Sequence, residues 1–354
     1  MRKYLLFIFA VILLTGTNAG GKTFSFEYQK IVEMPENPEL TVINTVGKIE
    51  IKGAPVEKMT VSAVKHVRAT DQEEAEEVAE HIEIKVGQSG QKFSIKTNFM
   101  RYKNGSESFW NKLFGSGEDS FGAVDFVITV PHKCRLDIDN GGGTITISGI
   151  YDEVIAAGTS DNLSLTDIRG DLMLNSMTGD IFLNNIVGRS DITTGASNIE
   201  FHSITGAVDI HSTSGIKKGS HIMGPISISQ TSGAVDVQYL TGDLKLRSTS
   251  GNISVQQEEG AVNIETHTGD VDIKTELFTD RDFYIETSTG SIDFKVPETS
   301  SGFIRIETTS GEINTKLAIS IDSISQNRMT GSFGNGGPQI TLRTENGDIT
   351  VREF

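Results

Sequence analysis

The chain of 354 residues carries 47 acidic and 31 basic side chains, which gives a net charge of −16. Lys and Arg are scattered along it, so no basic stripe is present to contact phosphates, and this argues against nucleic-acid binding. Its apolar fraction of 36% is enough for a buried core. Cys134 is the single cysteine, so no intrachain disulfide can form, and we expect it to be a small buried hydrophobic residue.

Residues 1–19 have the three parts of a secretory signal peptide. Arg2 and Lys3 form a charged start, residues 4–14 an apolar stretch, and residues 17–19 a small-residue cleavage site. We therefore expect export to the periplasm, the cell exterior or the cell surface. No later run of eighteen apolar residues follows and no cysteine stands at the cleavage site, so we expect no membrane span and no lipid anchor in the mature chain.

Residues 20–130 are predicted to be a β-rich segment with one short helix. Between the second and third strand-like runs, residues 70–79 read as a helix, because Asp71 can cap its start and Glu74 stands three residues later. The strand-like runs cover residues 40–51, 58–67, 81–86, 92–97 and 124–130.

An aromatic-rich loop over residues 100–122 lies within this segment. Its Phe109, Trp110 and Phe114 stand among Gly, Ser and charged residues. Such side chains can anchor a sugar ring, a membrane interface or a partner groove, and this loop is our candidate contact surface. The alternative is that the aromatic residues, at helical spacing, fold back and cover the first coil.

Residues 131–317 are dominated by a nine-residue period. Fifteen positions taken every nine residues from Gly143 to Gly269 include twelve glycines, and in thirteen of these units the second and fourth residues after that position are apolar. The exceptions are the units that begin at Gly188 and Gly215. Alternation over about five residues predicts a short strand with one buried face, and the glycine predicts a tight corner.

Short strands of this kind bury their apolar faces only when they stack, so the period predicts a parallel β-solenoid. Two units would make a flattened coil of eighteen residues and three a triangular coil of twenty-seven, and the pattern fits both. An antiparallel sandwich is the structural alternative, but its loops usually vary in length. Residues 318–337 are irregular and precede two last units, so residues 318–354 are predicted to be a cap with the last strands.

Several segments together resemble a known family. Residues 45–51 (TVGKIEI), an acidic helical insert, residues 124–131 (VDFVITVP) and repeated Thr-Ser-Gly or Thr-Gly-Asp turns are similar to the bacterial putative-adhesin family of unknown function, itself similar to auto-transporter adhesin head domains. The resemblance covers residue 24 to the carboxyl end. It implies a β-solenoid beyond the cytoplasmic membrane with an adhesin-like role, and it implies no catalytic residues.

Carboxylates on the repeats offer one catalytic alternative. Asp191 and Asp209 occupy the same position eighteen residues apart, and a two-unit coil would stack them as an acid and base pair or a calcium site. Elsewhere this position carries Ser, Asn and Lys, as an ordinary solvated face does.

No metal or cofactor site is predicted. Nonapeptide calcium corners need Asp two residues after Gly, whereas here Asp follows Gly directly, as after Gly179 and Gly242. His202 and His211 belong to adjacent units, which a two-sided coil places on opposite faces.

The sequence therefore predicts an exported, non-enzymatic β-solenoid with rows of Thr, Ser, Asn and Asp on its outer faces. Such rows suit many weak hydrogen bonds to a glycan or a cell-envelope protein, so we expect an adhesin-like binding or scaffold role. A polysaccharide-acting enzyme that uses Asp191 and Asp209 is the alternative. An exposed coil end also offers a surface for self-association.

Overall fold

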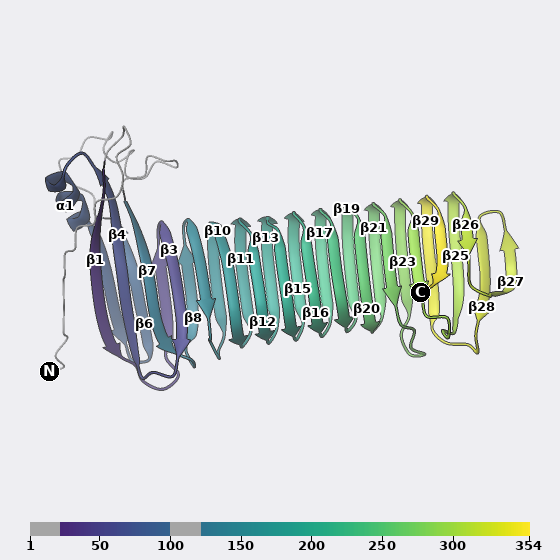
Figure 1. Ribbon diagram of the computed structural model, residues 1–354, viewed down its shortest axis with the longest axis horizontal. Helices are drawn as coiled ribbons and strands as arrows, with labels where there is room; N and C mark the ends of the chain where they lie inside the picture. Colours follow the sequence, from purple (N-terminus) through teal and green to yellow (C-terminus); the bar gives the residue numbers. More distant parts are fainter. Residues whose placement is uncertain (1–21, 100–121) are drawn as a thin grey trace. The chain divides into compact units, whose positions relative to one another are not determined.

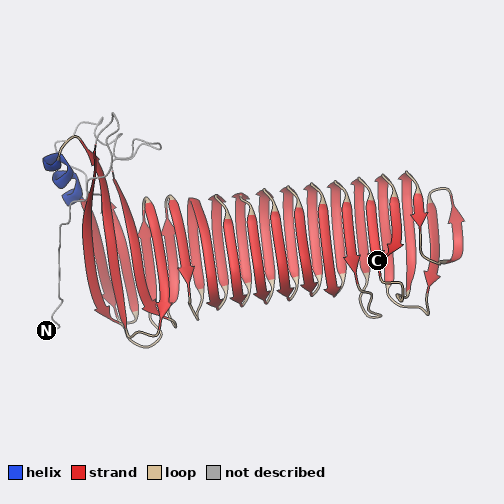
Figure 2. Ribbon diagram, in the orientation of Figure 1, coloured by secondary structure: helices blue, strands red, loops and turns tan. Residues whose placement is uncertain are grey.

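The computed structural model describes residues 22–99 and 122–354, and the chain forms two compact units, Met1–Ser176 and Met177–Phe354. Strands make up most of the described residues, and a single helix, α1 (Gln72–His81), accompanies them (Figures 1 and 2). The fold is a β-solenoid, as predicted.

In the second unit, successive strands alternate between two parallel sheets. Residues pair at intervals of eighteen, as in Ile181 with Ile199 and Val208 with Ile226. Each regular coil therefore has two strands and eighteen residues, and the triangular alternative is wrong. Sheet A contains β12 (Ile181–Val187), β14 (Ile199–Thr205), β16 (Lys217–Met223), β18 (Val235–Thr241), β20 (Ile253–Glu259), β22 (Val271–Thr275) and β24 (Ile292–Val296). Sheet B contains β13 (Ser190–Ala196), β15 (Val208–Ser214), β17 (Ile226–Ser232), β19 (Leu244–Ser250), β21 (Val262–Thr268) and β23 (Phe283–Thr289).

The interior and the corners follow the predicted pattern. Val208, Val235 and Ile253 are each 1% exposed and line a dry core between the sheets. At the corners, Gly206 has φ +138°, and a Cβ there would lie only 2.2 Å from the carbonyl oxygen of Gly188 in the coil before. Glycine is needed because no other residue combines this conformation with so close an approach.

The unit that begins at Gly215 places a lysine inside the core. Lys217 is 0% exposed, and its Nζ donates to Ser212 Oγ at 2.6 Å, Gly215 O at 2.9 Å and Ser214 O at 3.1 Å. Burial lowers the pKa of Lys217 to about 8. Three acceptors thus satisfy a cation that forms no ion pair with any carboxylate of the described residues.

The second exception of that unit is Gly219, which makes room for an aromatic ring. A Cβ at Gly219 would lie 2.5 Å from the ring of Phe201, one coil earlier in the same sheet. Phe201 is itself fully buried. The missing apolar side chain is therefore compensated by a larger neighbour.

In the first unit, the order of strands in the stack differs from their order in the chain. β2 and β3 pair in parallel with β6 and β7 on one side and with β8 and β9 on the other, so the earliest coil lies inside. The predicted run 40–51 divides into β2 and β3, and β1 was not predicted. The strands are β1 (Lys22–Glu33), β2 (Glu39–Asn44), β3 (Gly47–Ala54), β4 (Lys58–Ala69), β5 (Ile82–Ser89), β6 (Lys92–Phe99), β7 (Gly122–Pro131), β8 (Arg135–Asn140), β9 (Gly143–Ser148), β10 (Val154–Arg169) and β11 (Leu172–Thr178).

Antiparallel strands and the helix close the outer end of this unit. β4 pairs with β7 and β1 with β4, all antiparallel, while β5 pairs with β6 in the other sheet. Asp71 accepts from the backbone N–H of Glu74 at 3.0 Å, and the Glu74 carboxylate accepts from the N–H of Thr70 at 2.8 Å, which confirms the predicted helix start. The helix contacts β1, β4 and β5 and buries Ala75, Val78 and Ala79.

The second unit also contains a coil whose position in the stack differs from its position in the chain. β29 pairs in parallel with β23 and β25, and β30 with β24 and β26, so the last two units of the sequence lie inside the stack (Figure 1). The antiparallel strands β28 and β27 follow β25. The bounds are β25 (Gly302–Ser310), β26 (Ile313–Thr315), β27 (Ser320–Ser325), β28 (Arg328–Phe333), β29 (Gln339–Asn346) and β30 (Ile349–Glu353).

Candidate binding groove

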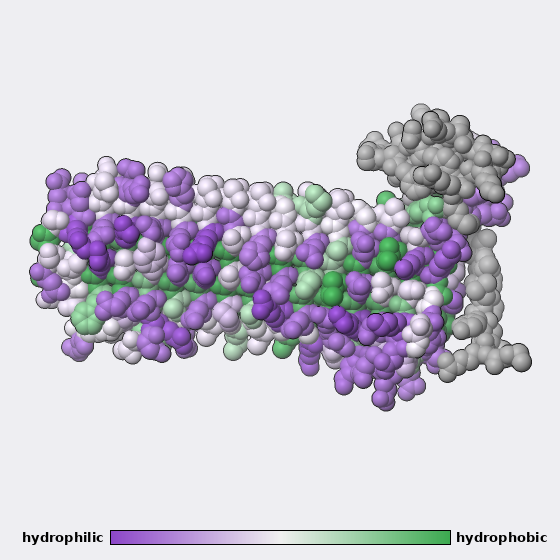
Figure 3. Space-filling view, turned by 180° about the vertical axis from the view of Figure 1, so that it is seen from behind, coloured by the Kyte–Doolittle hydropathy of each residue, from purple (hydrophilic) through white to green (hydrophobic). Residues whose placement is uncertain are grey.

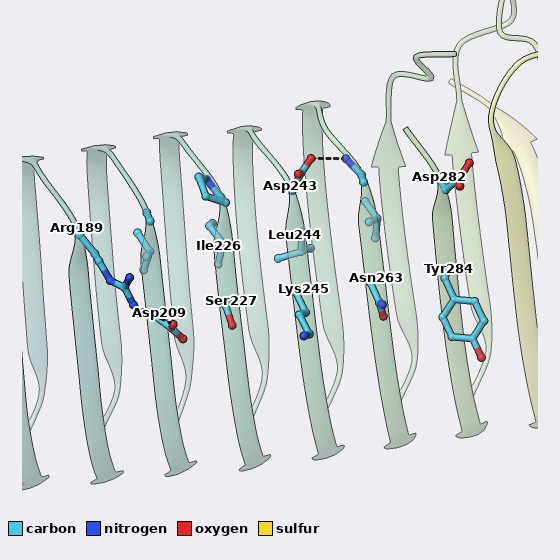
Figure 4. A pocket seen from close by; sticks show the side chains of 15 residues that line it. Arg189, Asp209, Ile226, Ser227, Asp243, Leu244, Lys245, Asn263, Asp282 and Tyr284 are labelled. Atoms are coloured by element: carbon cyan, nitrogen blue, oxygen red, sulfur yellow. Dashed lines mark hydrogen bonds and ion pairs between the residues drawn. The ribbon is translucent and has the colours of Figure 1, made fainter. Parts of the chain in front are cut away.

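A groove of about 510 Å³ crosses the outer face of sheet B, and all of its lining lies in the second unit (Figure 4). It passes over the strands from β15 to β23, with Arg189 just before β13 at one end. The residues that line it are Arg189, Ala207, Val208, Asp209, Pro225, Ile226, Ser227, Asp243, Leu244, Lys245, Ala261, Val262, Asn263, Asp282 and Tyr284.

One outward side chain from each strand forms a row along the groove. Register pairs join Asp209 to Ser227, Ser227 to Lys245, Lys245 to Asn263 and Asn263 to Tyr284. Neighbouring strands lie about 4.8 Å apart, so the row extends over roughly 19 Å. Figure 4 shows Ser227, Lys245 and Asn263 side by side, with the ring of Tyr284 after them.

Small residues at the corners give the groove its depth. The position after each corner glycine is Ala207, Pro225 or Ala261 in three of the coils that line it, and none of these side chains reaches far outward. Asp243 occupies the same position in another coil, where its Oδ1 accepts the N–H of Ala261 at 2.9 Å. The groove thus combines apolar walls with a polar row, as ligand sites usually do.

The Arg189 end of the groove is an ion-pair network. Arg189 Nε lies 2.8 Å from Asp191 Oδ1, and its Nη2 lies 3.6 Å from Asp209 Oδ2. His211 Nε2 lies 3.5 Å from Asp209 Oδ1. A single guanidinium thus faces two carboxylates at this end of the groove.

The middle of the groove is less satisfied. Lys245 is exposed and forms no ion pair with any described residue, and Asn263 Oδ1 is buried with no hydrogen-bond partner among them. A buried acceptor without a partner is costly, and Asp209 Oδ1 at the Arg189 end is a second one. Ser227, Lys245 and Asn263 therefore offer a hydroxyl, a cation and an amide to one ligand.

Tyr284 closes the other end. Partial burial, and then the hydrogen bond that its hydroxyl donates to Glu286, raise the pKa of Tyr284. The phenol therefore stays protonated at neutral pH, and its ring presents an aromatic surface to the groove.

The structure brings Asp191 and Asp209 together as stacked neighbours in β13 and β15. Arg189 lies within ion-pair distance of both carboxylates. This arrangement suits a structural role at the groove end.

The Asp and Asn residues that follow the corner glycines bind backbone amides of the next coil. Asn252 Oδ1 accepts the N–H of Asp270 at 3.1 Å, and Asp270 Oδ1 accepts the N–H of Ser291 at 2.8 Å. These side chains join coils and do not converge on an ion. Among the residues that the structure describes, no group of three His, Cys, Asp or Glu side chains could hold a metal.

The other candidate residues take varied places. His202 lies in sheet A and His211 in sheet B, as a two-sided coil requires. Cys134 is buried as predicted, and burial raises the pKa of its thiol to about 12. Phe109, Trp110 and Phe114 lie outside the described residues. Within the described part of the chain, no helix is both long enough and apolar enough to cross a membrane.

Sequence comparison identifies one family. The model described as Toastrack DUF4097 matches residues 38–241 and 238–352. No curated protein sequence matches the chain.

Structural comparison gives matches of low similarity. A putative cell adhesion protein from Clostridium sporogenes has 13% identity and a TM-score of 0.22, and the match covers 93% of this chain and 100% of that one. Putative adhesins from Bacteroides fragilis and Parabacteroides distasonis have 11% and 10% identity and TM-scores of 0.23 and 0.27, and each match covers 93% of this chain and 97% of the other. Scores this low carry no functional argument.

Proposed function

We propose that this chain, which belongs to the Toastrack DUF4097 family, is an exported, non-enzymatic binding module of the cell envelope whose sheet B groove holds a glycan. The observation that carries the proposal is the row of Ser227, Lys245 and Asn263 along the groove, in which the exposed Lys245 has no ion-pair partner among the described residues. A glycan supplies hydroxyl donors and acceptors along the whole row, and the faces of its sugar rings pack on Pro225 and Tyr284.

The proposal is tested by retention of the protein on immobilised cell-wall and surface polysaccharides. Lys245→Ala combined with Asn263→Ala should weaken binding about 10-fold or more, because each removes a hydrogen-bonding group worth roughly 1 kcal/mol or more. Matched controls are Lys218→Ala and Ser254→Ala, which change exposed residues at the same position of sheet A units. Retention of no glycan, or equal loss in the controls, contradicts the proposal.

A role in the cell envelope requires export, and export can be tested separately. The charged and apolar parts of residues 1–19 form a signal peptide. Sequencing the amino terminus of protein recovered from the periplasm or medium should find Gly20 as the first residue. An intact Met1 in exported protein would contradict this cleavage site.

The aromatic loop is a second proposed contact surface. If Phe109, Trp110 and Phe114 bind a partner, Trp110→Ala should weaken binding to envelope material and leave the melting temperature unchanged. A large fall in the melting temperature would instead show that the loop covers the fold.

The enzymatic alternative is tested with the same protein. We expect no release of reducing sugar or unsaturated product from polysaccharides. Product release by the purified protein that disappears in the Asp191→Asn, Asp209→Asn double variant would favour the enzyme over the binding module.

A further inference from the structure

The outer end of the second unit exposes a free strand edge. β27 pairs only with β28 among the described residues, so one side of its backbone has no strand partner. All six of its residues are exposed. A free edge of this kind is a template for another strand.

Two isoleucines of β27 lie on the same face because the strand contains a bulge. Ile321 pairs with Gly331 and Ile324 with Met329, and Asp322 is the extra residue between them. Gly331 and Met329 are two residues apart and both buried, so their face is the one that covers the core. The isoleucines therefore extend the core-facing side of sheet B beyond the last covered strand.

These isoleucines lack a cover. Ile321 is 50% exposed and Ile324 is 66% exposed. Apolar surface is visible at the end of the second unit that carries β27 (Figure 3). In contrast, the outer end of the first unit has α1 packed over its buried residues.

We propose that this end binds a second copy of the chain, with β27 of one copy antiparallel to β27 of the other. This proposal is independent of glycan binding. A two-fold axis through the free edge joins two identical strands, continues sheet B from one copy into the other, and brings the isoleucines of both into one apolar cluster.

The charges at this end favour a second copy. A chain with a net charge of −16 repels its copy over most of its surface, but β27 carries only Asp322. Lys316, also exposed, lies just before the strand, so the two ends that meet have balanced charge. The patch is smaller than a standard interface, so we expect a dimer with a dissociation constant on the order of 10 µM.

Sedimentation velocity over a range of protein concentrations tests the proposal. The wild-type protein should shift from monomer to dimer, and Ile321→Lys with Ile324→Lys should weaken dimerisation at least about 10-fold without a change in melting temperature, because both side chains are exposed. The matched control is Ile31→Lys, which changes a 53% exposed isoleucine on β1, an edge strand of the first unit.

Disulfide crosslinking gives a second measurement that does not depend on the isoleucine variants. Ser323→Cys, near the middle of β27, should crosslink to its own copy, whereas Ser254→Cys on the exposed face of sheet A should not. The native Cys134 is buried and should stay unreactive.

A wild-type protein that stays monomeric, a double lysine variant that still dimerises, or equal crosslinking at residues 254 and 323 would overturn the proposal. So would loss of dimerisation on deletion of residues 100–121 alone, since this would place the contact in that segment.

Discussion

The end of the first unit that carries α1 and the end of the second unit that carries β27 are closed in partly different ways. Each unit ends with a coil that is displaced from its order in the chain, β2 and β3 in one and β29 and β30 in the other, and antiparallel strands lie beyond it. The first unit then adds a capped helix, whereas the second leaves Ile321 and Ile324 of β27 exposed. Protection of a solenoid end thus has two separable parts, the turning of the last strands and the covering of the core.

The displaced coils should be equally sensitive to their corner glycines. Gly47 has φ +131° and Gly347 φ +159°, and a Cβ would lie 2.2 Å from Val124 O in the first case and 2.0 Å from Gly290 O in the second. Gly47→Ala and Gly347→Ala should each lower the free energy of unfolding by about 4 kcal/mol. Urea denaturation measures this, and Gly90→Asn, at an open turn, should have an effect below about 1 kcal/mol. A small loss of unfolding free energy in only one of the two alanine variants would show that the two coils do not depend equally on their corner glycines.

Detaching α1 should expose the end of the first unit, as the end of the second unit that carries β27 is already exposed. Val78 is 3% exposed, so Val78→Asp buries a charge or detaches α1, at a cost of about 3 kcal/mol. Hydrogen exchange of the amides in β1 and β5 should become faster. The exposed Glu77→Gln is the control, and unchanged protection in the Val78 variant would mean that the helix does not cover this end.

The buried Lys217 of the second unit should make the free energy of unfolding depend on pH. Below pH 8 both folded and unfolded chains bind the Lys217 proton. Between about 8 and about 10.5 the unfolded chain binds more protons, so the free energy of unfolding rises with pH, by about 3 kcal/mol. Urea denaturation of the wild type and of Lys217→Met at several pH values should show this rise only in the wild type. A rise that persists in Lys217→Met must come from other groups.

The smallest expected effect concerns the helix start. Asp71→Ala removes the acceptor of the Glu74 N–H and should cost about 1 kcal/mol. Chemical denaturation measures it against Gln72→Ala, an exposed neighbour in the first turn. An equal loss in both variants would mean that the cap does not hold α1.

The repeat could be predicted from the sequence because its causes are local. Corner glycines and alternating apolar residues specify strand, turn and buried face within nine residues. The number of units per coil could not be predicted, since both choices bury the same side chains. In the structure, the interval of eighteen is also seen in a set of residues with positive φ, Asn185, Ser203, His221 and Tyr239. Serine and tyrosine rarely take this conformation, so this set of positions could not be recognised in the sequence.

Coil order and the groove were beyond sequence reasoning for a different reason. The strands at residues 339–353 have the same pattern as any other unit, and only the long-range pairing of β29 with both β23 and β25 places them inside. Ser227, Lys245 and Asn263 looked like an ordinary solvated face. The available signal was the small residue at positions 207, 225 and 261, which deepens the surface beside them.

In the regular coils, corner glycines such as Gly206 and Gly224 stack on the carbonyl of the corner glycine eighteen residues earlier, and this has an evolutionary consequence. Tandem duplication or loss of eighteen codons adds or removes one whole coil and leaves every remaining contact in place. A change of nine codons exchanges the two faces for the entire downstream part. Relatives of different length should therefore differ by multiples of eighteen residues in the regular coils, so that recombination between repeats can adjust the reach of the molecule without the invention of a new core.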